Sequence, residues 1–177
     1  GNAYLLSGAP GGVYNLAGGG VLAPVIPVTA VSRNTHGAAG DFDINLPATG
    51  PRGVECRSGG GGANYTLVFT FPNNLSSPGS ASVSSGTGMT GSNIIGPSSN
   101  QCSVSLTGVT NQQYITVTLS SVVDVTGGTG GASATMGVLI GDTNANGTVN
   151  ASDISQTKSR SGQAATVSIF RSDVNAN

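Results

Sequence analysis

The chain has 177 residues, and only 7% of them are charged, far below the usual quarter or so of a globular domain. The net charge is −1 at pH 7, so nothing in the composition indicates the basic surface that binds nucleic acids or anionic membranes, and we expect neither as a partner. Hydrophobic residues make up 37%, which is enough for a modest core, and the length suits one β-sandwich with a small appendage.

The first 32 residues contain no charge, since Arg33 is the first charged residue. Glycines and prolines interrupt each apolar run, so none reaches the roughly 20 continuous apolar residues that a membrane-spanning helix needs. Pro24 and Pro27 confine residues 21–28 to a sheet edge if they pair at all. We therefore predict that residues 1–32 form an uncharged, extended segment able to act as a donor strand or an edge strand.

Residues 33–140 read as short strands between turns rich in glycine, serine and proline. Apolar and polar residues alternate with the period of two that is typical of half-buried strands. The alternating runs are residues 41–46, 64–71, 102–106, 114–125 and 132–140. Ser120 and Ser121 interrupt the longest run and indicate a bulge. This pattern predicts a mainly β fold, an antiparallel immunoglobulin-like β-sandwich.

Two cysteines, Cys56 and Cys102, lie on separate predicted strands. In a secreted chain the simplest interpretation is one disulfide that closes a loop of about 47 residues and stabilises the fold by about 3–4 kcal/mol. The alternative is two buried free thiols. A cysteine metal pair is not expected, because the chain has only one histidine.

The side chains needed for catalysis are scarce. His36 is the only histidine and Glu55 the only glutamate. We interpret His36 as a loop histidine that makes one structural hydrogen bond. Asp41 and Asp43 alternate with apolar residues, so the solvent face of a strand explains them better than a metal site. We predict that the chain is not an enzyme.

A twelve-residue window near the C-terminus has the oxygen pattern of a calcium loop. Asp142, Asn144, Asn146, Asn150 and Asp153 stand at loop positions 1, 3, 5, 9 and 12. Gly147 stands at position 6, where the loop turns sharply, and Thr148 at position 7 would offer its backbone carbonyl. Ca²⁺ takes about 6–8 oxygen ligands, so the predicted site holds Ca²⁺ with Asp142, Asn144, Asn146, Thr148, Asn150 and Asp153.

Residues 141–154, followed by Lys158 and Arg160, resemble the first half of a type I dockerin repeat. That family uses an EF-hand-like loop and one following helix, with aspartate at position 12. The chain departs from the family at Asn146, where aspartate is common, and at Thr157, where a leucine is expected. With two carboxylates, the affinity for Ca²⁺ should be weak, about 10⁻⁴–10⁻³ M. The layout before the loop resembles an immunoglobulin-like or cohesin-like module.

Asp173, Asn175 and Asn177 repeat positions 1, 3 and 5 of a second loop, and the sequence shown reaches no further. We predict a second metal site there. Its remaining ligands come either from the rest of an intact second repeat or from a neighbouring chain. Residues 141–177 thus form a dockerin-like calcium-binding segment whose second repeat is incomplete in this sequence.

Together these features predict a secreted, non-enzymatic, calcium-binding structural module. We expect it to self-assemble into an extracellular filament or surface layer through its N-terminal segment and its C-terminal tail, since heterologous contacts generate filaments. The alternative is a docking module of a larger secreted protein, with a cohesin-like protein or a glycan as its partner.

Overall fold

The computed structural model describes residues 23–176, which contain ten strands, one α-helix and three short 3-10 helices. The strands are β1 (Thr29–Thr35), β2 (Asp41–Asn45), β3 (Val54–Glu55), β4 (Tyr65–Thr70), β5 (Leu75–Ser77), β6 (Ser80–Ser85), β7 (Met89–Ile95), β8 (Gln101–Thr107), β9 (Gln113–Asp124) and β10 (Thr129–Val138). The helices are η1 (Gly37–Ala39), η2 (Gly60–Gly62), α1 (Ala151–Arg160) and η3 (Phe170–Ser172).

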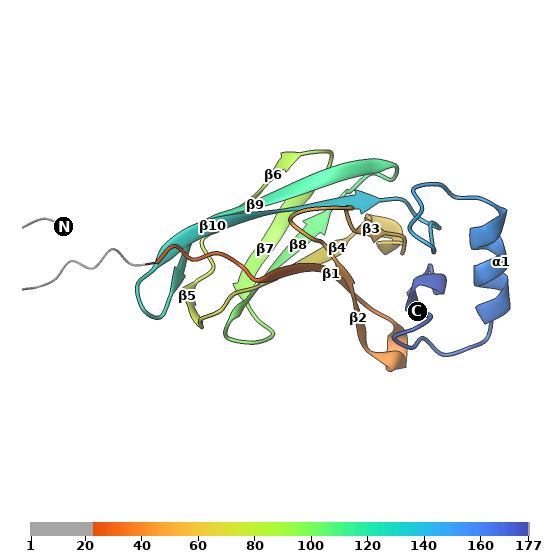
Figure 1. Ribbon diagram of the computed structural model, residues 1–177, viewed down its shortest axis with the longest axis horizontal. Helices are drawn as coiled ribbons and strands as arrows, with labels where there is room; N and C mark the ends of the chain where they lie inside the picture. The colour runs from red at the N-terminus through yellow and green to blue at the C-terminus, as the bar shows by residue number, and fades with distance from the viewer. Residues whose placement is uncertain (1–22, 177) are drawn as a thin grey trace, which may run out of the picture.

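The strands form two five-stranded sheets that pack on one hydrophobic core (Figure 1). One sheet has the antiparallel order β2-β1-β4-β8-β7. The other has the order β3-β10-β9-β5, with β6 also paired to β9. Its pairs are antiparallel except for β3, which runs parallel to β10 over two residues. The prediction of a mainly β fold with antiparallel sheets is confirmed.

The core contains the apolar residues that alternate along the predicted strands. Leu67 and Phe69 of β4 are fully buried, and they face Ile115 and Val117 of β9 within the same cluster. Thr116 and Thr118 alternate with these valine and isoleucine side chains and point outward, where hydroxyl pairs link β9 to β10. Side chains on two facing sheets therefore exclude water from a single interior.

The bulge predicted at Ser120 and Ser121 is confirmed by the register of β9 and β10. Leu119 pairs with Ala132, but Val122 pairs with Gly130, so two residues of β9 lie opposite one residue of β10. The extra residue shifts the phase of the strand. Val122 is consequently buried, whereas Val123 turns outward.

The predicted segment 1–32 lies mostly outside the described residues, which begin at Ala23. Its last four residues, Thr29 to Ser32, belong to β1, which pairs with both β2 and β4. The boundary predicted between residues 32 and 33 thus falls inside an interior strand. Val25 forms an isolated parallel bridge to Gly130.

The predicted disulfide is not formed in the structure, where Cys56 and Cys102 are separate, buried free thiols. Cys56 lies near the Tyr65 end of β4, since the Tyr65 hydroxyl donates to the carbonyl of the next residue, Arg57. Tyr65 pairs with Leu106, and Cys102 lies four residues from Leu106 along β8, which is about 13 Å. A disulfide needs Cα atoms within about 7 Å.

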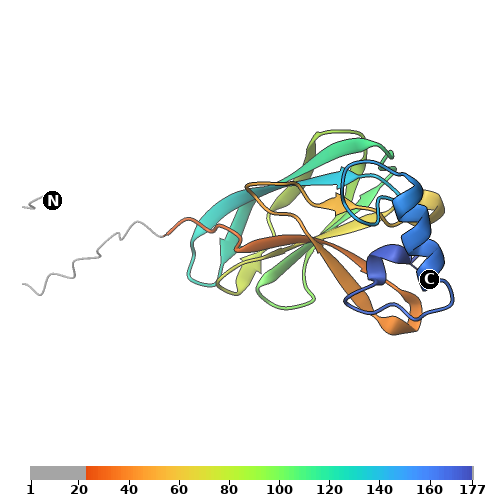
Figure 2. The same ribbon diagram turned by 45° about the vertical axis from the view of Figure 1, so that its right-hand side comes forward.

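The C-terminal segment lies at one end of the sandwich. Figure 1 shows α1 there, with η3 between the helix and the sheets. Figure 2 shows η3 beside the turn that joins β1 to β2. No helix among the described residues combines the length and the apolar character needed to span a membrane.

Candidate calcium site

The candidate loop begins where β10 leaves the sheet. Two backbone hydrogen bonds hold the chain at this point: the amide of Leu139 donates to Glu55 O at 3.0 Å, and that of Gly141 donates to Cys56 O at 2.9 Å. Gly141 has φ of +94°, a conformation that costs glycine little and other residues more. The strand therefore delivers Asp142 at a fixed position and direction.

The Asp142 side chain is completely buried inside the loop. Its Oδ1 accepts the amide of Asn146 at 3.1 Å, and its Oδ2 accepts the amide of Gly147 at 2.9 Å. The Asn146 amide also donates to Asn144 Oδ1 at 3.0 Å. One N–H group thus holds side-chain oxygens from loop positions 1 and 3 next to each other.

Asp153 closes the loop from the first turn of α1, and it is 1% exposed. Its Oδ2 accepts the Asn150 amide at 3.0 Å, while Asn150 Oδ1 accepts the Ser152 amide at 2.8 Å, which forms a capping box. Its Oδ1 accepts the Asn144 amide at 3.3 Å. Burial by itself raises the pKa of Asp153, but these backbone donors and the hydroxyl of Thr143 together outweigh it and hold the pKa below its ordinary value.

The remaining predicted ligands lie on the outer side of the loop. Asn146 Oδ1 accepts both the amide and the hydroxyl of Thr148, at 2.9 and 2.8 Å. Asn150 Nδ2 donates to the Thr148 hydroxyl at 3.1 Å. The six predicted residues therefore share one closed loop, with Asp142 and Asp153 inside and Asn146, Thr148 and Asn150 exposed.

Arg171, in η3, supports this loop from outside, and sequence reasoning missed it. Its Nε donates to Thr143 O at 2.9 Å, and its Nη2 donates to Asp142 O at 3.1 Å and Val54 O at 3.0 Å. The guanidinium thus ties the tail, the start of the loop and β3 together. The only signal in the sequence was that charged residues are rare, so that each arginine is a candidate for a structural role.

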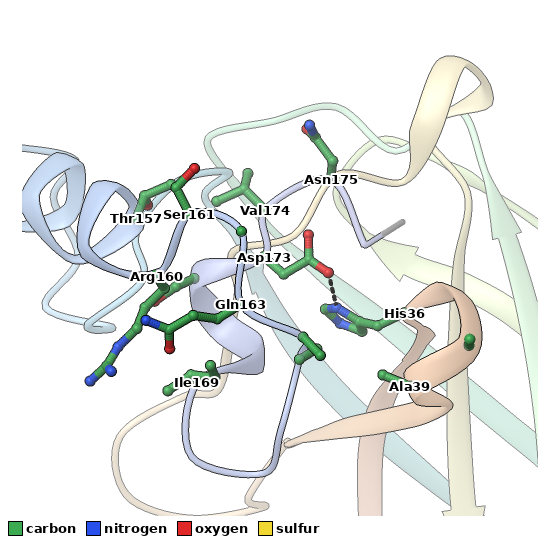
Figure 3. Close-up of a pocket in the computed structure, with 15 residues that line it drawn as sticks. His36, Ala39, Thr157, Arg160, Ser161, Gln163, Ile169, Asp173, Val174 and Asn175 are labelled. Atoms are coloured by element: carbon green, nitrogen blue, oxygen red, sulfur yellow. Dashed lines mark hydrogen bonds and ion pairs between the residues drawn. The ribbon is translucent and has the colours of Figure 1, made fainter.

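The predicted second metal site is not assembled as a loop within the described residues. Asp173 Oδ2 lies 2.7 Å from Nδ1 of His36, and Asn175 lies nearby in the same pocket (Figure 3). Asn177 is outside the described residues. The pocket, of about 460 Å³, separates the end of α1 from the turn between β1 and β2. A carboxylate predicted as a ligand therefore attaches the tail to the sandwich.

His36 lies in the loop between β1 and η1, where it belongs to a buried polar network. Glu55 and Arg57 are fully buried and form a bidentate ion pair, with Arg57 Nε 2.8 Å from Glu55 Oε1 and Nη2 2.7 Å from Oε2. Glu55 also accepts the hydroxyl of Ser32. Arg57 donates its other hydrogens to Phe42 O, to Ser32 O and toward His36 Nε2 at 3.3 Å.

This network determines the tautomer of His36. A guanidinium has only donors, so Nε2 of His36 must accept, and Nδ1 carries the hydrogen that it donates to Asp173. Both ring nitrogens are occupied. Phe42 and Phe170 pack edge-on against the ring, with centroids 5.2 and 6.1 Å away. His36 is thus a structural link between the sandwich and the tail.

The candidate ligand atoms of the loop are oxygens, which are the ligands that a hard cation binds. No described side chain forms an ion pair with Asp142 or Asp153, although both carboxylates are buried. Buried carboxylates in proteins are normally paired with a cation or bound to a metal. Within residues 23–176 no group of three or more His, Cys, Asp and Glu side chains gathers, so the other ligands would be amide and backbone oxygens. Calcium accepts such oxygens.

The chain matches no protein-family model, no curated protein and no solved structure.

Proposed function

We propose that this chain is a non-enzymatic, calcium-binding structural module of the cell exterior, with a dockerin-like loop at residues 142–153. One observation carries the proposal: Asp142 and Asp153 are buried in one loop, and neither carboxylate forms an ion pair with a side chain in the described part of the chain, since Arg171 contacts only the backbone carbonyl of Asp142. Calcium would be held by Asp142, Asn144, Asn146, Thr148, Asn150 and Asp153, and it would supply the missing positive charge.

The proposed structural role follows from what the loop connects. It joins β10 to α1, and Arg171 and Asp173 attach the tail that follows back to the sandwich. An ion bound in the loop would therefore stabilise the end of the molecule as one rigid unit. An assembling subunit requires such a fixed end, because its contact surface must have one orientation.

We propose that the chain is not an enzyme because its single histidine already makes structural hydrogen bonds. Both nitrogens of His36 have hydrogen-bond partners, and Arg57 occupies the side where a nucleophile would stand in a triad. Self-assembly is proposed because the first 32 residues contain no charge, and an uncharged extended segment is suited to adding a strand to a neighbouring sheet.

A docking function is the second candidate, favoured by exposed apolar side chains in the dockerin-like segment. Val149, Ile154 and Val167 are all exposed, and Ile154 lies on α1. Such side chains suit a cohesin-like partner that covers the helix. A docking module would remain monomeric on its own, whereas a structural subunit would assemble.

Negative-stain microscopy and light scattering distinguish the two candidates. The purified protein is observed in millimolar calcium, then in excess chelator, together with an Asp153→Asn variant. Ordered polymers that weaken on chelation, and that form less readily in the variant, support the structural role. A monodisperse monomer in every condition contradicts it and favours docking.

A further inference from the structure

The outer edge of β10 is incompletely paired. On its inner side β10 pairs with β9 along its length. On its outer side it meets Val25 at Gly130, and β3 at Gly137 and Val138. Between these two contacts, Ser133 and Thr135 have no backbone partner on the outer side among the described residues.

The direction of the backbone groups follows from the neighbouring bonds. Thr129 O accepts the amide of Val25 at 3.2 Å, and the amide of Gly137 donates to Gly53 O at 2.9 Å. Every second residue of a strand turns its N–H and C=O groups to the same side. Ser133 and Thr135 therefore direct their N–H and C=O groups to the open side. The unpaired part of β10 between the two contacts is about 20 Å long.

Pro27 explains why the chain does not close this edge itself. A parallel ladder that starts with the Val25 amide on Thr129 O continues with the amide of residue 27 on Gly131 O. Proline has no amide hydrogen, so the ladder stops. The next residue, Val28, donates to Thr70 O at 2.7 Å, in the other sheet. The chain thus crosses between the sheets and leaves β10 open.

The surroundings of the open edge are uncharged and partly apolar. A cavity of about 270 Å³ lies there, lined by residues 27–30, residues 45–48 and Ser133. None of these residues carries a charge. Ile26 and Val28 are 59% and 64% exposed at its border. An exposed strand edge beside apolar side chains is a template for strand addition.

We propose that the open edge of β10 binds the N-terminal segment, residues 1–22, of a second copy of this chain as an added strand. The inference rests on the proposed self-assembly and names its contact. The segment matches the edge in charge, since it contains no charged residue. At about 3.3 Å per residue it spans up to about 70 Å, more than the gap requires.

The direction of the chain indicates that the added strand comes from a second molecule and not from the same molecule. Val25 runs parallel to β10 at Gly130, and Ala23 lies against Gly128. From Val25 back to Ala23 the described chain therefore runs away from Ser133. To fill its own edge, the segment would have to turn back over Val25 to Val28, whereas the segment of a neighbour meets the edge directly.

The test uses hydrogen exchange and a matched pair of variants of the full chain. Val28→Lys places a charge at the open edge. Val125→Lys is the control, because Val125 is 63% exposed and directly follows β9, where its amide donates to Asn74 O just before β5. We expect Val28→Lys to raise the concentration needed for assembly at least about tenfold, and Val125→Lys to leave it unchanged. The amides of Ser133 and Thr135 should exchange more slowly in assemblies than in dispersed protein.

A synthetic peptide of residues 1–22, added to dispersed protein, separates this contact from assembly itself. Slower exchange at Ser133 and Thr135 on adding the peptide supports the contact even if the chain never polymerises, in which case the proposed structural role fails alone. Assemblies in which these two amides exchange at the dispersed rate overturn the contact and leave the structural role standing. If the peptide has no effect on exchange and the chain does not assemble, both the contact and the structural role are overturned.

Discussion

Nδ1 of His36 lies 2.7 Å from Oδ2 of Asp173, a residue 137 positions later in the chain. His36 also accepts a hydrogen bond from Arg57, which pairs with Glu55, and all three side chains are buried in the sandwich. Asp173 therefore attaches the tail to the same sandwich from which β10 leads into the candidate calcium loop. The loop is consequently held from both of its ends.

Replacement of Asp173 by asparagine should release part of the tail. The variant loses a charged acceptor for the His36 N–H, so we expect the free energy of unfolding to fall by about 1–3 kcal/mol. Urea unfolding in chelator measures it. Asp41→Asn is the control, since Asp41 is exposed on β2 and accepts only from Thr35 in the described structure. Equal stability of the two variants would contradict the link.

Replacement of Arg171 by alanine should weaken calcium binding without removing a ligand. Arg171 holds the carbonyls of Asp142 and Thr143, and loss of groups that orient ligands typically lowers metal affinity about 10–100-fold. Calorimetric titration of the variant measures the dissociation constant. Arg160→Ala, at the exposed end of α1, should bind calcium as the native chain does. An unchanged constant in Arg171→Ala would show that the loop needs no support from the tail.

Stability should decrease in acid through Asp124. Hydrogen bonds from Asn73 and Thr126 hold the pKa of Asp124 below its ordinary value, and the amides of Thr126 and Gly128 add to them. A folded pKa below the unfolded value of about 3.9 stabilises the protein above about pH 4, and this contribution is lost as the pH falls through the folded pKa.

The measurement is urea unfolding in chelator between about pH 6 and pH 2. An Asp124→Asn variant should be less stable than the native chain near pH 6, and the difference should shrink as the pH falls. A difference between the two chains that stays constant over this range is the opposing result.

Cys56 and Cys102 should be unreactive thiols in the folded protein. Burial raises the pKa of each to about 11, so little thiolate is present at neutral pH. We expect no labelling by iodoacetamide in native buffer and two labelled thiols after unfolding without a reductant. If unfolding exposes no reactive thiol, the two cysteines form the disulfide that the sequence suggested.

The sequence predicted the strands whose apolar residues alternate, because burial on one face leaves a period of two. β4 and β9 are of this kind. β6 and β7 were not predicted, since serine, threonine, glycine and asparagine make up most of both strands, and only Ala81, Val83 and Ile95 pack against the core from them. Their pairing with β8 and β9 depends on the fold and leaves no periodic trace.

The candidate loop could be identified from the sequence because the six predicted ligands lie within twelve residues, so their spacing alone places them in one loop. The supports of that loop were not predictable. Arg171 contacts Val54 across 117 positions, and Asp173 contacts His36 across 137. Such contacts are decided by how the tail folds back on the sandwich. The same limitation made a disulfide look plausible, since the sequence does not show the distance along β8.

Chemical unfolding with and without calcium tests the central claim most directly. With a dissociation constant of about 10⁻⁴–10⁻³ M, 10 mM calcium should raise the free energy of unfolding by about 1.4–2.7 kcal/mol. The gain should vanish in an Asp142→Asn, Asp153→Asn double variant, and magnesium should give less. Equal stability of the native chain in 10 mM calcium and in chelator would contradict the account.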